Sequence, residues 1–147
     1  MAEGPRIRIK QIEGYRFEVD FGASHPGLLV DEAEPIGEGE GPFPEQILIA
    51  GVTNCLCASL MFASGKFGQE IQGIEAEASC RVERNAEGRL RISGIDVAIQ
   101  FGATAEAVPR IDKVLAQFER FCTVSESVKA GIPVTVAVRD GDGNRLK

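Results

Sequence analysis

The chain has 147 residues, 44% hydrophobic and 26% charged, a composition typical of one globular domain and not of a disordered chain. Its 16 Lys and Arg residues against 22 Asp and Glu residues give a formal net charge of -6, which argues against binding to a nucleic-acid backbone or an anionic membrane surface. Because the first residues hold no basic segment followed by an apolar run, we expect no export signal and a cytoplasmic location. From the length we expect a single domain over residues 1–147.

Two stretches near the N-terminus alternate polar and apolar side chains, which is the pattern of a half-buried strand. Residues 6–12 and 15–21 follow this pattern, and Glu13-Gly14 between them predicts a turn. The two stretches therefore predict an antiparallel hairpin. Residues 28–30 predict a short third strand.

Residues 31–44 change character, with three glycines, three prolines and five acidic residues. This composition predicts a loop. Two interpretations stay open, a solvated connection or a rim beside a functional site. The Gly-Glu-Gly-Glu-Gly run at 37–41 is not a phosphate-binding loop, because it lacks Lys and its acids would repel phosphate.

The segment after Glu45 has no charged residue until Lys66, and at 1.5 Å per residue it predicts a helix of about 30 Å. A membrane span has the same length, but polar residues dilute this segment and no basic flank orients it. A helix that is apolar nearly all round needs cover on most sides. Since so small a chain has little else to cover it with, we predict a dimer whose partner covers part of the helix.

Residues 71–84 and 89–101 predict two long strands joined by a turn at 85–88, that is, a second antiparallel hairpin with one covered face. The apolar residues expected on that face are Ile74, Ala76, Ala78, Cys80 and Val82 in the first strand and Ile95, Val97, Ile99 and Phe101 in the second.

Helical spacing returns over residues 104–121, with Pro109 expected in the first helical turn. A second helical piece over residues 125–129 should end at Gly131, and residues 132–138 predict a last strand. The resulting order, β-β-β-α-β-β-α-β, predicts the α+β class.

Cysteine is the residue type on which we expect any chemistry to depend. The chain has four cysteines but one histidine, His25, and it has no C-x-x-C motif, so we expect no structural zinc and no other metal. In a reducing cytoplasm the cysteines are expected to be buried or reactive thiols and not structural disulfides.

Helical geometry separates the cysteines. Cys55 and Cys57 lie about 200° apart around a helix, so they cannot both face one site. Cys80 is on the apolar face of a strand, which predicts packing. Cys122 closes an amphipathic helix beside a polar stretch. The residues leave open a thiol pair of Cys55 or Cys57 with Cys122 and, alternatively, free buried cysteines.

Two motifs resemble those of a known family. Residues 44–55, Pro-Glu-Gln-Ile-Leu-Ile-Ala-Gly-Val-Thr-Asn-Cys, resemble the central helix of the OsmC/Ohr family (osmotically inducible protein C and the organic hydroperoxide reductases), which has a Pro-Glu-x-Leu start and a Cys ten residues after the Glu. Residues 121–127, Phe-Cys-Thr-Val-Ser-Glu-Ser, followed by Ile-Pro-Val at 132–134, resemble the family's second motif, His-Cys-Pro-Val-Ser-x-Ser with a following Ile-Pro-Val strand.

The resemblance implies an OsmC-like α+β fold, with antiparallel sheets wrapped around central cysteine-bearing helices in an intertwined homodimer. It also implies a thiol-dependent peroxidase that reduces organic hydroperoxides in oxidative stress and needs no cofactor. Cys55 would match the peroxidatic Cys, and Cys122 the resolving Cys that forms a disulfide with it. Glu45 would match the Glu that holds an activating Arg. A dithiol reductant of the lipoyl type would restore the thiols.

The chain differs from the family at the activating cation. Residues 21–44 contain no Arg and no Lys, although the hydroperoxide reductases carry their Arg in the loop before this helix. His25, Arg16, Arg120 and an Arg of the partner chain are the other candidates. Two alternatives therefore stay open: a non-catalytic OsmC-like dimer that binds an apolar ligand or senses oxidants stoichiometrically, and a monomeric structural domain. Cys57 matches no motif position and is interpreted as packing.

Overall fold

The protein is an α+β domain with antiparallel sheets, as predicted. The computed structural model describes residues 2–131, 137, 139 and 146, so the predicted last strand lies outside the described residues except at 137. The elements in chain order are β1 (Arg8–Glu13), β2 (Arg16–Asp20), β3 (Leu28–Val30), α1 (Pro44–Lys66), β4 (Glu75–Arg84), β5 (Leu90–Gln100), the 3-10 turn η1 (Ala105–Ala107), α2 (Ile111–Gln117), the 3-10 turn η2 (Phe118–Phe121) and α3 (Thr123–Ala130).

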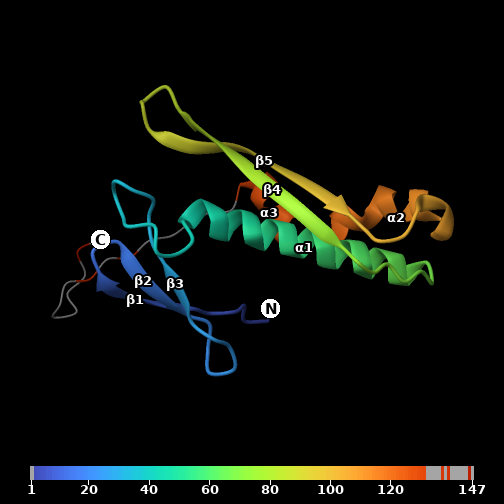
Figure 1. Cartoon of the computed structure of the whole chain (residues 1–147), viewed down its shortest axis with the longest axis horizontal. Coiled ribbons are helices and arrows are strands. Elements are labelled where there is room, and N and C mark those ends of the chain that lie inside the picture. The colour runs from blue at the N-terminus through green and yellow to red at the C-terminus, as the bar shows by residue number, and fades with distance from the viewer. Residues whose placement is uncertain (1, 132–136, 138, 140–145, 147) are drawn as a thin grey trace.

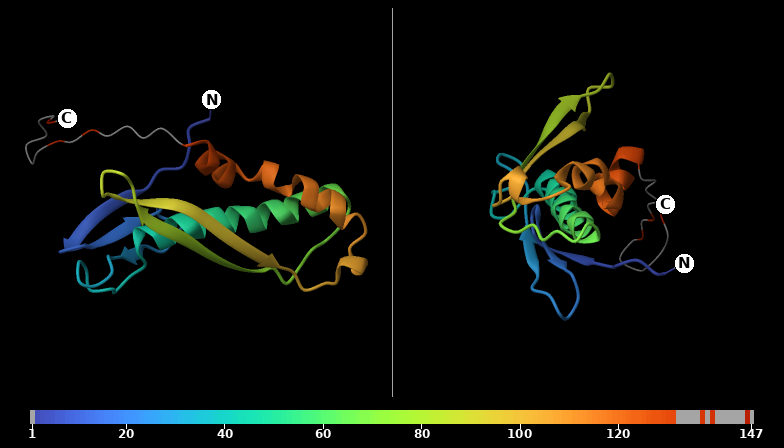
Figure 2. Two further views of the ribbon diagram at one scale, coloured as in Figure 1. Left: turned by 90° about the horizontal axis from the view of Figure 1, so that it is seen from above. Right: turned by 90° about the vertical axis from the view of Figure 1, so that its right-hand side faces the viewer.

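Helix α1 runs through the middle of this arrangement (Figure 1). The three-stranded sheet β1-β2-β3 lies on one side of it, the β4-β5 hairpin lies across another side, and α2 and α3 run along a third. Figure 2 shows these three groups around α1 in the view along the helix. By length and composition α1 could cross a membrane, but the core helix of a soluble protein meets the same test.

The strand registers pair the apolar residues that the alternation placed together, but strand β1, which was expected to be half-buried, is exposed along its length, and Val82, expected on the covered face, is 43% exposed. Strand β2 pairs with β1 and β3, with Val19 opposite Ile9 and Leu28. In the second hairpin the opposed pairs are Ala76 with Ile99, Ala78 with Val97 and Cys80 with Ile95. The pairing slips between Arg81 and Val82, so Val82 lies opposite Ile92.

Strand β4 begins four residues later than its alternation suggested. Gly73 has φ +65°, a backbone conformation that interrupts a strand. Ile71, only 2% exposed, instead packs in the core with Leu60, Ala63, Val108 and Val114. The core therefore lies between the C-terminal half of α1 and the segment that leads into α2.

Pro109 does not lie in a first helical turn, so that expectation was wrong. Val108 is buried in the core after the turn η1, and Arg110 then takes a left-handed φ of 64° as the N-cap of α2. The chain has to reverse direction at this point, and α2 begins only at Ile111. The predicted end of the last helix is confirmed, because α3 ends at Ala130 with Gly131 as its left-handed C-cap.

The loop between β3 and α1 is organised around one carboxylate. Asp31 is 2% exposed, and its side chain accepts hydrogen bonds from the backbone N–H groups of Glu32, Glu38 and Glu40 at 2.8, 3.2 and 3.1 Å. Gly37 is required here, since a Cβ atom on it would lie 2.4 Å from Oδ1 of Asp31. The loop is therefore a closed structural turn.

The same loop connects the sheet to the start of α1. Arg16 of β2 forms ion pairs with Glu13 and Glu40 at 2.7 Å and with Glu38 at 3.8 Å. Helix α1 then begins with Pro44 in its first turn, and the Gln46 side chain accepts a hydrogen bond from the N–H of Phe43. These contacts fix where the helix begins relative to the sheet.

Replacing the buried carboxylate should loosen this loop. Burial raises the pKa of Asp31, but the three N–H donors and Arg16 outweigh it and bring the pKa below its ordinary value. The stabilisation is thus complete above the unfolded-state pKa of about 3.9 and is lost as the pH falls through the lower folded-state pKa. In Asp31→Asn at neutral pH we expect faster hydrogen exchange at the N–H groups of Glu38 and Glu40, measured by NMR.

Glu34→Gln is the matched control, because it removes a charge from an exposed position of the same loop. It should leave exchange at both N–H groups unchanged. Equal exchange rates in Asp31→Asn and the wild type would contradict the role of the carboxylate.

Candidate functional site

Two of the four cysteines meet where α1 and α3 pack together. Cys55 is half-buried in α1, and Cys122 is the fully buried N-cap residue of α3. The Cys122 sulfur accepts a hydrogen bond from the N–H of Ser125 at 3.3 Å. The Cys55 and Ser59 side chains also lie within hydrogen-bonding reach of this sulfur. Of the two cysteines that the sequence left open as partners of Cys122, Cys55 is the one whose side chain lies near it, and both are free thiols.

The surroundings of Cys122 favour its thiolate. Burial by itself raises the pKa of the Cys122 thiol, but the hydroxyl of Ser125, the Cys55 thiol, the N–H of Ser125 and the hydroxyl of Ser59 together bring the pKa below its ordinary value. The first turn of a helix adds to this, since its N–H groups carry partial positive charge. All four cysteines are free thiols in this structure.

The other two cysteines lie apart from this pair. Cys57 is half-buried on α1, and burial raises the pKa of its thiol, so a smaller fraction of it is thiolate at neutral pH. Cys80 is half-buried on β4, opposite Ile95. Both placements agree with their interpretation as packing residues.

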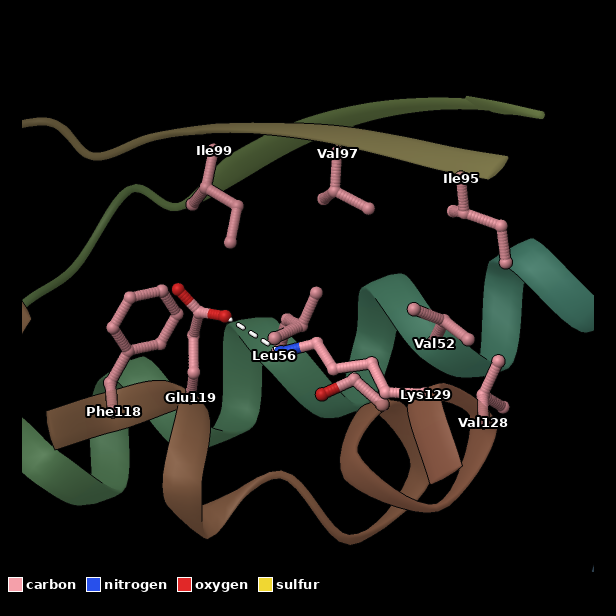
Figure 3. A pocket seen from close by; sticks show the side chains of 10 residues that line it. Val52, Leu56, Ile95, Val97, Ile99, Phe118, Glu119, Val128 and Lys129 are labelled. Carbon is pink, nitrogen blue, oxygen red and sulfur yellow. Dashed lines mark hydrogen bonds and ion pairs between the residues drawn. The ribbon is translucent and has the colours of Figure 1, made fainter. Parts of the chain in front are cut away.

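A cavity of about 260 Å³ reaches Ser125, the neighbour of Cys122. Its walls come from α1, β5, η2 and α3, and Ser125 is the lining residue that also contacts Cys122. Figure 3 shows Ile95, Val97 and Ile99 on one side and Val52, Leu56, Phe118 and Val128 on the other. The ion pair of Glu119 with Lys129, 2.9 Å long, lies across this space. The cavity is suited to an apolar group with a polar end near Ser125.

The candidate cations lie elsewhere. Glu45 is half-buried in the first turn of α1 and forms no ion pair with any residue that the structure describes. Arg16 is occupied by the acids of the loop. His25 and Arg120 are exposed. Over the described part of the chain, therefore, the structure does not bring an Arg to Glu45.

Sequence reasoning missed the two serines of the site. Ser59 follows Cys55 by four residues in α1, and helical i, i+4 spacing places the two on one face. Ser125 follows Cys122 by three residues, the spacing of an N-cap contact. Ser125 belongs to the second motif at 121–127 but was given no role there, and neither serine could be placed beside a thiol until the two helices were packed together. Among the described residues, no cluster of three or more His, Cys, Asp or Glu side chains is arranged to hold a metal ion.

The comparisons with known proteins agree on one family. The sequence profile described as OsmC-like protein matches residues 37–137. No curated protein sequence matches the chain. An OsmC-like protein of unknown function from Vibrio cholerae has a similar structure, with a TM-score of 0.70 at 12% identity over 87% of this chain and 95% of that one.

Two further structures are similar. The OsmC-like protein of Mycoplasma pneumoniae gives a TM-score of 0.71 at 13% identity, over 90% of this chain and 91% of that one. The organic hydroperoxide resistance protein OhrB of Bacillus subtilis gives 0.65 at 16% identity, over 88% and 93%. At such identities the likeness shows the fold.

The contact between the two sulfurs should be visible in their titration. In a background where Cys57 and Cys80 are replaced by Ala, removing the donor with Cys55→Ala should raise the pKa of Cys122, because its thiolate loses a hydrogen bond. The measurement is thiolate absorbance near 240 nm against pH. Ser127→Ala, half-buried on the same helix, is the control and should not shift the curve. A Cys122 midpoint that is the same with and without Cys55 would refute the contact.

Proposed function

The chain belongs to the OsmC-like protein family, and from this membership and the contact between two free thiols we propose that it is a thiol-dependent peroxidase that reduces organic hydroperoxides. The observation that carries the proposal is the placement of the Cys55 side chain against the buried Cys122 sulfur. A two-cysteine peroxidase needs these two sulfurs to reach each other without a large movement of the backbone.

The proposed reaction has three steps. The Cys55 thiolate attacks the outer oxygen of the hydroperoxide, so that an S–O bond forms, the O–O bond breaks and the alkoxide takes a proton to leave as an alcohol. The Cys122 thiolate then attacks the Cys55 sulfenic acid, which forms the disulfide and releases the hydroxyl group as water after protonation. A dithiol of the lipoyl type supplies two electrons and two protons, and the two thiols are restored.

The surroundings of Cys122 support the second step. Attack on a sulfenic acid needs a thiolate, and the donors around the Cys122 sulfur favour that form. The full burial of Cys122 keeps it from competing reactions with solvent oxidants, whereas the half-buried Cys55 is the more accessible sulfur. These differences support Cys55 as the sulfur that meets the peroxide and Cys122 as the one that resolves it.

The cavity supports an organic substrate. Its walls are mostly aliphatic and aromatic, so burial of a hydrocarbon group there would be favourable, at about 25 cal/mol for each Å². Hydrogen peroxide has no such group. The name of the similar Bacillus subtilis structure, an organic hydroperoxide resistance protein, agrees with this substrate class.

One observation favours a second candidate function. Within the described residues no Arg or Lys forms an ion pair with Glu45, which is the contact that would hold an activating cation in a hydroperoxide reductase. A binding protein for an apolar ligand, or a sensor that is oxidised once by each oxidant molecule, would not need that cation. Steady-state turnover distinguishes these functions from the peroxidase, because neither regenerates itself.

We also propose that the protein is a homodimer. Met61 and Phe62 of α1 are each 55% exposed, and Ile47 near its start is 37% exposed. The inner face of the β1-β2-β3 sheet forms with Pro44 and Ile47 a second, strongly apolar cavity of about 500 Å³. A second copy of the chain that covers these surfaces would give α1 the burial that its composition requires.

Turnover with purified components tests the peroxidase. Cumene hydroperoxide and dihydrolipoamide should be consumed in equal amounts over many cycles, and Cys55→Ser should reduce the rate to that of the uncatalysed reaction, since it removes the nucleophile. Cys57→Ser is the matched control and should keep close to wild-type activity. After one equivalent of peroxide without reductant, mass spectrometry should find a disulfide between Cys55 and Cys122. Absence of turnover above the Cys55→Ser level would reject the enzyme.

Sedimentation equilibrium tests the dimer. The wild type should sediment at twice the 15.8 kDa chain mass, and Ile47→Glu should shift it toward monomer, because it would bury a charge in the apolar surface of the second cavity. Ile36→Glu, at a position 61% exposed in the loop, should leave the dimer intact. A wild-type monomer at all accessible concentrations would refute the assembly.

A further inference from the structure

Ser125 has a buried hydroxyl group without a hydrogen-bond partner. Its side chain is 4% exposed, and its Oγ atom bonds to no other group among the residues that the structure describes. The backbone N–H of the same residue is already used by the Cys122 sulfur. Buried polar groups are nearly always hydrogen-bonded, because leaving one unpaired costs free energy. An unpaired buried hydroxyl at a candidate site therefore points to a missing ligand.

The hydroxyl lies between the sulfur and the cavity. It is close enough to the Cys122 sulfur to lower the pKa of that thiol, but it forms no hydrogen bond of ordinary geometry with any described residue. Ser125 is also one of the lining residues of the 260 Å³ cavity. The other polar lining residues, Glu119 and Lys129, are paired with each other. Ser125 is thus the neutral hydrogen-bond donor that the cavity offers to a guest.

The cavity is large enough for such a guest. A dry cavity of about 150 Å³ in another protein binds benzene, and this one, at about 260 Å³, has room for a branched or aromatic hydrocarbon group with an oxygen attached. Apolar walls and one unpaired hydroxyl match a molecule with a hydrocarbon body and a single oxygen-bearing end.

We propose that the Ser125 hydroxyl donates a hydrogen bond to the alkyl-side oxygen of the hydroperoxide whose hydrocarbon group fills this cavity. The inference rests on the proposed peroxidase function and adds a residue to it. When the O–O bond breaks, negative charge develops on that oxygen, which leaves as the oxygen of the alcohol. A hydrogen bond to it is then stronger in the transition state than in the ground state, so it increases the rate.

The alcohol product provides a test that does not depend on turnover. Binding of 2-phenyl-2-propanol and of tert-butylbenzene, which has a methyl group in place of the hydroxyl, can be measured by NMR titration. The wild type should prefer the alcohol, relative to the hydrocarbon, by about 3- to 10-fold more than Ser125→Ala does, the range expected for one net hydrogen bond. Ser125→Thr keeps a hydroxyl and should restore the preference. Ser127→Ala, on the same helix, should behave like the wild type.

Kinetics and titration separate this role from a structural one. In Ser125→Ala, kcat/KM for cumene hydroperoxide should fall about 10-fold or more, with recovery in Ser125→Thr. An alcohol preference that is unchanged in Ser125→Ala, or a loss of rate explained fully by a shifted Cys122 titration, would overturn the inference.

The two proposals fail in different ways. Wild-type turnover with an unchanged alcohol preference in Ser125→Ala would reject the Ser125 contact and leave the peroxidase. No wild-type turnover, with an alcohol preference that Ser125→Ala removes, would reject the peroxidase and keep Ser125 as a ligand contact. Loss of both would reject both.

Discussion

The constraint on which this structure depends is the coverage of α1. The helix has 23 residues, with a single acidic residue in its first turn and a single basic one in its last. Between them no side chain carries a charge, so every side of the helix needs apolar cover to avoid contact with water. The chain provides that cover from three directions: β4 and β5 over one side, α2 with η2 and α3 over a second, and the N-terminal sheet near the start (Figure 2). Some apolar side chains of α1, such as Met61 and Phe62, stay exposed because a single chain does not cover them.

The same coverage creates the thiol pair. Because α2, η2 and α3 follow one another along α1, Cys122 lies at the junction of η2 and α3, where the chain packs against α1 (Figure 2). Cys122 thus becomes the N-cap of a helix that packs against α1 and lies in the interior, next to the turn of α1 that carries Cys55 and Ser59. The cavity beside it is the space that β5 leaves between its own aliphatic residues and those of α1. Packing of apolar surfaces is therefore enough to explain why two thiols and an apolar cavity lie together.

Local patterns were sufficient to predict most elements, but contacts between distant segments were not. Period-two alternation predicted both hairpins and placed Ala78 and Cys80 on the same face as Val97 and Ile95, which lie opposite them in the structure. This was possible because the alternation within one strand shows which of its side chains share a face. The acid-rich loop gave no sign of order, since its structure depends on Asp31 meeting N–H groups seven and nine residues further along. Arg110 could not be foreseen as a left-handed N-cap. Ser59 and Ser125 acquired meaning only after α1 and α3 had been placed against each other.

The charge distribution connects activity with assembly. The groups that lower the pKa of Cys122 are neutral: the N–H of Ser125, which donates a hydrogen bond to the sulfur, and nearby hydroxyl and thiol groups. Neutral donors of this kind suit a resolving thiolate, which attacks a neighbour that is already in place. A first attack on a peroxide needs stronger stabilisation of charge at Cys55, and Glu45, at the start of the same helix, has no cation paired with it in the described part of this chain. Ile47, two residues after Glu45, lies on an apolar surface that is exposed to solvent in the single chain. A second copy of the chain that covers this surface would be placed to supply the cation as well, so we expect catalysis to require the dimer.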